Sequence, residues 1–144
     1  MFGGRWSLLV MAILGLGCTD DCHDVPCGSS LIVELAPDQG LEDGSYEVTL
    51  ETPLGTTVCG FVIAGDDASM LTCSPDVANL DKAELPAFML VRYITDQPET
   101  LHVTVTRDGD ELTTTDVTPE YEQVIADPGR CGGACTSAQV SVAF

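Results

Sequence analysis

The stretch Tyr46-Glu47-Val48-Thr49-Leu50-Glu51 decides the fold class. Its apolar side chains occupy every second position, and polar side chains fill the positions between them. Successive side chains of a β-strand point to opposite faces, so this alternation predicts a strand with one buried face and one solvated face. The same pattern occurs upstream at Leu31, Val33 and Leu35. Residues 31–35 and 46–51 are therefore predicted to form two amphipathic strands.

Further strands are expected toward the C-terminus. Residues 56–64 are apolar on both faces, which is typical of an interior strand covered on both sides. Residues 88–95 form another largely apolar run, and residues 101–106 alternate again. The dipeptide Asp108-Gly109 joins this last run to a threonine-rich one at residues 111–118, a strong hairpin signal. Two more strands are expected at residues 120–126 and 138–144.

A single helical segment is considered. Ser74-Pro75-Asp76 is similar to a helix start, with serine as the cap and proline in the first turn. Val77, Leu80 and Glu84 would then complete about two turns before Pro86. An irregular crossover is the alternative for this segment.

Eight or nine short strands separated by turns predict an all-β protein, an antiparallel two-sheet β-sandwich stabilised by disulfides. A small barrel is the alternative. The arrangement resembles the immunoglobulin-like and transthyretin-like sandwiches of bacterial surface lipoproteins, over about residues 29–144. The resemblance is architectural, because the Cys-Trp-Cys core of antibody domains is missing: the only tryptophan is Trp6. With 144 residues the chain has room for one ordinary domain.

The first 17 residues have the layout of a secretory signal peptide, with Arg5 followed by an uncharged apolar run that ends at Gly17. A membrane-spanning helix needs about 20 apolar residues, and this run is shorter. Asp20, Asp21 and Asp24 follow it. We therefore expect an exported protein, with a retained transmembrane anchor as the weaker interpretation.

The end of this segment, Leu14-Gly15-Leu16-Gly17-Cys18, resembles a bacterial lipobox. It departs from the family pattern at Gly15, where leucine is usual, and agrees with it at Gly17. The resemblance implies that Cys18 is diacylated and becomes the mature N-terminus, which would hold the protein on a membrane. The residue after Cys18 is Thr19 and not the aspartate that marks inner-membrane retention in some lipoproteins, so the resemblance favours the outer membrane. Residues 18–28 would then be the lipidated cysteine and its tether.

Seven cysteines in a short chain indicate an oxidising compartment. Setting Cys18 apart leaves six that can all pair as disulfides, Cys22, Cys27, Cys59, Cys73, Cys131 and Cys135. Six cysteines allow 15 connectivities, and we expect the local one. This would join Cys22 to Cys27, Cys59 to Cys73 and Cys131 to Cys135.

The charge of the chain restricts its partners. It carries 23 acidic and 5 basic side chains, a formal net charge of −18. Binding to nucleic acid depends largely on Lys and Arg that neutralise phosphates, so no nucleic-acid partner is expected. The acidity is most simply explained by solubility, with divalent cations or a basic partner as minority interpretations.

No metal, cofactor or catalytic residue is predicted. The cysteine and histidine pairs suited to zinc lie at opposite ends of the chain, and the C-x-x-C redox motif is missing. His23 and His102 are the only histidines, and no G-x-S-x-G, H-E-x-x-H or phosphate-binding motif occurs. The paired carboxylates at Asp66-Asp67 and at Asp108 and Asp110 fall in expected turns. Calcium held by such a turn is the alternative to a purely structural role.

Three functions follow as hypotheses. The first is an envelope lipoprotein, anchored to the membrane through its lipid, whose sandwich is a noncatalytic structural or protein-interaction module with a protein as its partner. The second is a surface module for carbohydrate or calcium, which would require calcium stabilisation or an exposed aromatic cluster of Tyr46, Tyr93 and Tyr121. The third is a small hydrolase, which would require His102 to meet a serine or carboxylate inside a pocket.

Overall fold

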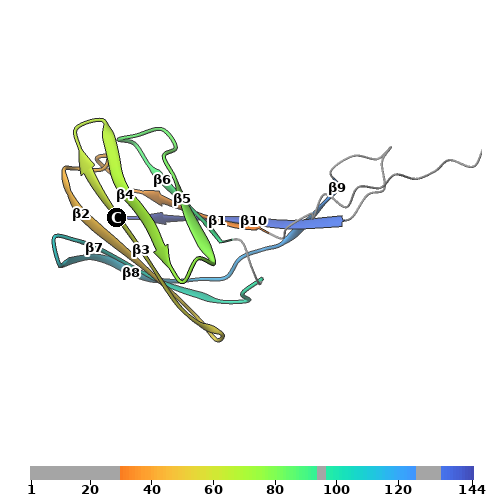
Figure 1. The fold of residues 1–144 in the computed structure, drawn as a ribbon. Coiled ribbons are helices and arrows are strands. Elements are labelled where there is room, and N and C mark those ends of the chain that lie inside the picture. Colours follow the sequence, from red (N-terminus) through yellow and green to blue (C-terminus); the bar gives the residue numbers. More distant parts are fainter. Residues whose placement is uncertain (1–29, 94–96, 126–133) are drawn as a thin grey trace, which may run out of the picture.

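Ten β-strands make up the computed structural model, which describes residues 30–93, 97–125 and 134–144. They form two sheets of five strands, in the orders β5-β6-β1-β10-β9 and β4-β3-β2-β7-β8. Figure 1 shows the two sheets facing each other. The strands are β1 (Ser30–Ala36), β2 (Gly44–Thr52), β3 (Gly55–Ala64), β4 (Asp67–Ser74), β5 (Ala78–Asp81), β6 (Met89–Tyr93), β7 (Leu101–Arg107), β8 (Asp110–Val117), β9 (Glu122–Ile125) and β10 (Ala134–Ala143).

The first and last strands lie side by side. β1 pairs with β10 in parallel, from Ser30 opposite Ser137 to Ala36 opposite Ala143. Every other pairing among the described strands is antiparallel. The prediction of an all-β protein with two antiparallel-rich sheets is therefore confirmed, with one parallel pair that sequence reasoning did not anticipate.

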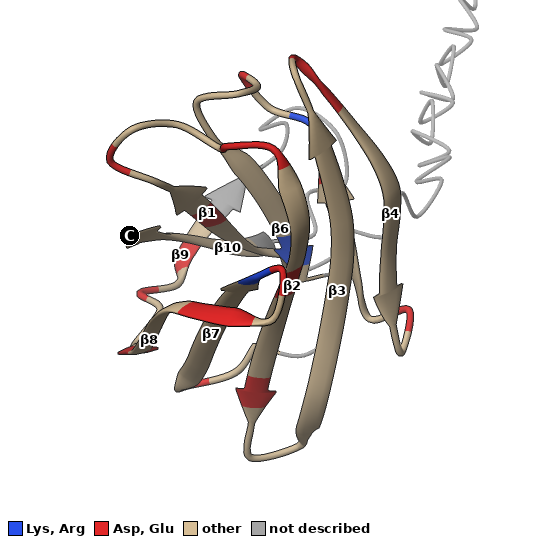
Figure 2. Ribbon diagram, turned by 90° about the vertical axis from the view of Figure 1, so that its left-hand side faces the viewer, with Lys and Arg blue, Asp and Glu red and all other residues tan. Residues whose placement is uncertain are grey.

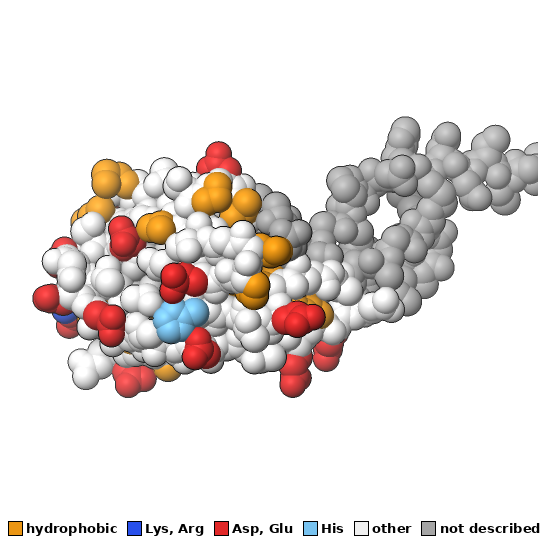
Figure 3. Space-filling view, turned by 90° about the horizontal axis from the view of Figure 1, so that it is seen from below, with side chains coloured by type: hydrophobic (Ala, Val, Ile, Leu, Met, Phe, Trp, Pro, Cys, Tyr) orange, Lys and Arg blue, Asp and Glu red, His pale blue; other side chains and the backbone are white. Residues whose placement is uncertain are grey.

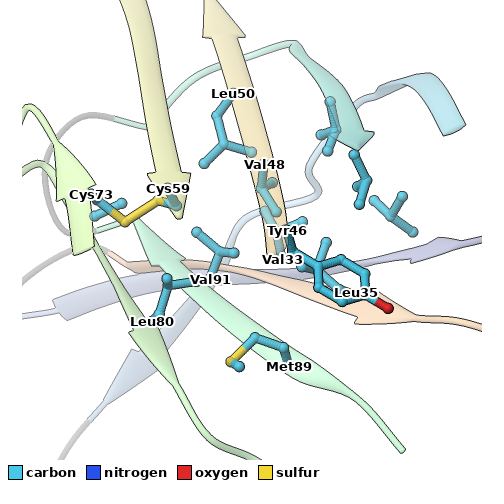
Figure 4. Packing of buried hydrophobic residues seen from close by; sticks show 14 of the residues in the cluster. Val33, Leu35, Tyr46, Val48, Leu50, Cys59, Cys73, Leu80, Met89 and Val91 are labelled. Carbon is cyan, nitrogen blue, oxygen red and sulfur yellow. A yellow bond between two sulfur atoms is a disulfide. The ribbon is translucent and has the colours of Figure 1, made fainter. Parts of the chain in front are cut away.

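The core fills the space between the two sheets. Figure 4 shows side chains from β1, β5 and β6 pointing toward those of β2, β3 and β4. Tyr46 and Phe61 stack there, with ring centroids 5.0 Å apart. Full burial of such a side chain contributes about 1.5–3 kcal/mol to stability. The largest fully buried side chains are Phe61, Leu31, Leu35, Leu50, Ile63, Met89, Leu101, Val33, Val48, Val91, Val103 and Val105.

The alternating stretches behave as predicted. Leu31, Val33 and Leu35 are buried on β1, and Tyr46, Val48 and Leu50 are buried on β2. β3 lies inside its sheet, between β4 and β2, but its second face is not covered. Val58 and Val62 are only half-buried there. Their neighbours on this face are cross-strand residues of the same sheet, Thr49 and Ser74 beside Val58 and Ser45 and Ser69 beside Val62.

The prediction of a helix after Ser74 is wrong. The segment instead contains the short strand β5, in which Ala78 and Leu80 are buried while Asn79 is exposed. Pairing of β5 with β6 supplies backbone hydrogen bonds and burial that two isolated helical turns would lack. Tertiary packing therefore overrides the local helix-start signal.

The hairpin expected at Asp108-Gly109 joins β7 to β8. Both turn residues have positive φ, 53° at Asp108 and 89° at Gly109, as the right-handed twist of a two-residue hairpin favours. The Asp108 carboxylate also accepts a hydrogen bond from the Ser45 backbone amide at 2.9 Å, and the Asp108 amide donates to the Ser45 carbonyl at 2.7 Å. The turn is therefore tied to the beginning of β2.

The two lateral sides of the sandwich differ. On one side the edge strands β4 and β5 of the two sheets pack together, and a disulfide joins Cys59 on β3 to Cys73 on β4. We call this the closed side. On the other side β8 is the last strand of its sheet, and we call this the open side.

Within the described residues, no helix is long and apolar enough to cross a bilayer.

Candidate functional site

The outer face of β2, β7 and β8 carries a regular array of polar side chains. The strand register aligns three rows across the sheet, in each case from β2 through β7 to β8. We call their nine residues the threonine–carboxylate face: Glu47, Thr106 and Glu111; Thr49, Thr104 and Thr114; Glu51, His102 and Asp116.

The face is polar because the opposite face of the same strands forms the core. Val48 and Leu50 on β2, and Val103 and Val105 on β7, are fully buried between the sheets. With a side-chain period of two, the residues between them must point outward. The four carboxylate-bearing residues of the face are all exposed.

His102 lies between two carboxylates. Its Nδ1 is 2.6 Å from Oδ1 of Asp116, and its Nε2 is 4.0 Å from Oε2 of Glu51. The hydrogen bond to Asp116 raises the pKa of His102, while partial desolvation acts in the opposite direction and the charges of Asp116, Glu51 and Glu111 add to the increase. Figure 3 shows the histidine (pale blue) with acidic side chains (red) beside it on an open surface. Chemically, this arrangement favours the protonated form of the imidazole.

The central row is uncharged. The Thr104 and Thr114 hydroxyl oxygens are 3.1 Å apart and form a hydrogen bond across β7 and β8. Thr49 lies opposite Thr104 on the other neighbour, β2. Cross-strand threonine pairs of this kind contribute roughly 0.2–1 kcal/mol to sheet stability.

The face has no Lys or Arg to neutralise it. The three basic residues that the structure describes each pair with a carboxylate elsewhere. Lys82 binds Asp67 at 2.7 Å, which lowers the pKa of Asp67, and Arg92 binds Asp81 at 3.1 Å. Arg107 pairs with Glu42. Figure 2 shows how few basic segments (blue) accompany the acidic ones (red).

Features expected of a catalytic or metal site are not brought together on this face. Among residues 30–93, 97–125 and 134–144, no group of three or more His, Cys, Asp or Glu side chains is placed to hold a metal ion. Within the same ranges, no serine hydroxyl bonds to His102, whose hydrogen-bond partner is Asp116. An open depression of about 370 Å³ lies on the other sheet, lined by Ile32, Glu120, Glu122, Ser137, Ala138 and Gln139.

The three tyrosines do not form an exposed aromatic platform. Tyr46 and Tyr93 are buried, at 3 % and 6 % exposure. Tyr121 is half-buried, and its hydroxyl donates to the Pro98 carbonyl at 3.0 Å. The stacking surface that a carbohydrate module would use is therefore absent from these three residues.

The sequence-predicted site residues divide into two groups. Cys59 and Cys73 form a disulfide, the pair proposed from their proximity in sequence. Cys18, Cys22, Cys27, Cys131 and His23 lie outside the described residues, as does the side chain of Cys135. The proposed lipid site and the two remaining disulfides therefore stay predictions.

Sequence reasoning identified the polar face of each strand but missed the array that the strands form together. The alternation at residues 46–51 and 101–106 signals two wet faces. It does not signal that Glu51, His102 and Asp116 form one row. Glu51 and His102 are 51 residues apart, so tertiary packing sets the register of β2 against β7, and a bulge between Val105 and Thr106 shifts the register within the β7–β8 hairpin.

Comparisons with known proteins supply no relative: no family model, no curated protein and no solved structure matches the chain.

Proposed function

We propose that the chain is a membrane-anchored envelope lipoprotein whose sandwich is a noncatalytic structural or protein-interaction module. Residues 1–17 would direct export, the lipid on Cys18 would hold the protein on the membrane, and residues 18–28 would form the tether. Thr19 favours the outer membrane. Two or more acyl chains give stable anchoring, which one chain does not.

We also propose that the sandwich is of the immunoglobulin-like or transthyretin-like class. Support comes from the path of the chain, which changes sheet between β1 and β2, β4 and β5, β6 and β7, and β8 and β9. Repeated crossings between two facing sheets are characteristic of Greek-key sandwiches.

The observation that supports the interaction function is the contrast between a buried apolar core and an exposed polar surface. Among the residues whose burial the structure describes, 22 apolar ones are buried in the core, and the disulfide at Cys59 and Cys73 adds a covalent link to it. The threonine–carboxylate face presents backbone-anchored side chains on rigid strands, and it ends at the edge strand β8. Rigid presentation lowers the entropy cost of binding, which suits a docking module.

The predicted tether also suits this role. β1 begins at Ser30 and runs away from the point where residues 18–28 would join the domain. The turns that follow β1, β3 and β7 lie at the other end of the sandwich. Residues 37–43 join the end of β1 to Gly44, and Ile63 and Arg107 lie beside that end of β2 in the register. A lipid on Cys18 would thus leave the lateral faces and the far end accessible.

The test is an intact mass of the mature protein together with membrane fractionation. The expected mass corresponds to a chain that begins at Cys18 with a diacylglyceryl adduct, and the protein is expected in the membrane fraction. Cys18→Ser should lack the adduct and leave the membrane fraction or keep its signal segment. A mature wild-type chain without lipid would overturn the anchoring proposal.

A further inference from the structure

The strand β8 ends its sheet with one side unpaired. It pairs with β7 through Leu101 opposite Val117 to Arg107 opposite Asp110, and no described strand pairs with its other side. At eight residues it is twice as long as β9, the outer strand of the other sheet on this side. An edge strand presents N–H and C=O groups that another strand can bind. The edges β4 and β5, in contrast, pack against each other.

The charge of this edge selects its partner. Glu111 and Asp116 point outward from β8, on either side of Thr114. Behind them lie Glu47 and Glu51 on β2, and the face contains no Lys or Arg. Lys82, Arg92 and Arg107 are held by carboxylates elsewhere. A strand added to β8 would therefore meet carboxylates that no Lys or Arg of the face neutralises, with His102 as the single basic group beside Asp116.

A second copy of the chain fits this edge poorly. If two β8 strands paired antiparallel along their whole length, Glu111 of each would lie opposite Asp116 of the other. Like charges directly opposite each other destabilise a strand pair. The net charge of −18 opposes self-association as well. Edge acids of this kind disfavour self-pairing while leaving the backbone groups available to a basic strand.

We propose that β8 binds an extended, basic segment of another protein, which adds to the sheet as a sixth strand. Lys or Arg on one side of that segment would lie beside Glu111 and Asp116. Its alternate residues would be small or β-branched, because they would continue the inner surface next to Thr113, Thr115 and Val117. Main-chain hydrogen bonds would supply affinity and the charge pattern would supply selectivity. This inference names the partner class of the interaction module and rests on that proposed function.

The test uses the full chain in a nonionic detergent and an eight-residue peptide that alternates Lys with Val. Binding is measured by calorimetry, and hydrogen exchange with mass spectrometry locates it. We expect saturable binding and slower exchange in residues 110–117. The same peptide with N-methyl groups on alternate residues keeps its charge but loses the donors along one edge, and it should not bind.

The charge requirement is tested with Glu111→Gln/Asp116→Asn, which should weaken binding at least about tenfold. The matched control is Asp76→Asn/Glu84→Gln, with the same charge change at two exposed residues on the closed side, and it should bind within about twofold of wild type. Equal binding by the N-methylated peptide, or protection outside β8, would overturn the proposal. No binding by the Lys-Val peptide while the lipid is present on Cys18 would also overturn it, and would leave the anchoring function standing.

Discussion

The closed side and the open side of the sandwich both end in β-strands, but the edge strands are packed together on the closed side and exposed on the open side. On the closed side, β4 and β5 pack together and the disulfide at Cys59 and Cys73 lies beside Phe61 in the core. On the open side, all residues of β8 are exposed or half-exposed, and among the described strands β8 pairs with β7 alone. Because the contact between the two edge strands and the disulfide both lie on the closed side, we expect that side to contribute more to stability than the polar edge at β8.

The largest expected effect is the difference in unfolding free energy between a substitution in the core, on β3, and one on the exposed face of β7. Phe61→Ala removes a ring that is 1 % exposed and stacks on Tyr46, and we expect it to lower the free energy of unfolding by about 3–5 kcal/mol. Thr104→Ala on the open face should cost less than about 1 kcal/mol. Urea denaturation of both variants measures the difference. Similar losses for the two substitutions would mean that the two regions do not differ in this way.

The disulfide should have the next largest effect. Cys59 and Cys73 are 14 residues apart, and opening a loop of this size costs about 3 kcal/mol in the chain-entropy description. Cys59→Ala/Cys73→Ala should therefore unfold at lower urea, while hydrogen exchange in β8 stays near its wild-type rate. An equal loss of protection in β8 and in β4 would show that the two sides are not independent.

A smaller loss is expected at the hairpin that leads into β8. Gly109 has a φ of 89°, which L-residues with a Cβ rarely adopt, and open space surrounds the position of an added Cβ. Gly109→Ala should therefore cost about 1–2 kcal/mol through backbone strain alone. Thermal unfolding of Gly109→Ala indistinguishable from wild type would argue against the turn geometry.

The smallest effect concerns His102 and depends on pH. Its pKa is raised above 6.5, mainly by the hydrogen bond that it donates to Asp116, so the pair stabilises the folded state below pH 6.5 and loses that contribution as pH rises through the folded pKa. Asp116→Asn should bring the NMR titration midpoint of His102 down toward 6.5. Wild type and variant should differ more in urea stability near about pH 6 than near about pH 9. A midpoint unchanged by the substitution would contradict the contact.

Much of the fold is predictable from the sequence because burial imposes a period of two on each strand. Tyr46, Val48 and Leu50 show the pattern directly, and Asp108-Gly109 marks the hairpin through its φ requirements. The partial exposure of Val58 and Val62 was not predictable. Valine is common both on the half-buried face of a strand and beneath a second layer, so its presence in the sequence does not distinguish the two. The strand β5 was missed because its burial depends on β6, a distant segment.

The candidate site was predictable only in part. The polar positions at Glu51 and His102 are visible in the alternation, and the excess of acid is visible in the composition. Their meeting with Asp116 depends on the register of β2, β7 and β8, which local sequence does not encode. The open edge depends on the order of strands in the sheet, and that is a property of the whole chain.

Residue-resolved hydrogen exchange of the free protein tests most directly whether the edge of β8 is unpaired. An antiparallel edge strand directs alternate amides toward its partner and the others to solvent. We predict that amides of β2 and β3 exchange slowly throughout, whereas alternate amides of residues 110–117 exchange fast. Uniformly slow exchange along β8, equal to that of β3, would show that this edge is already paired and would contradict the account.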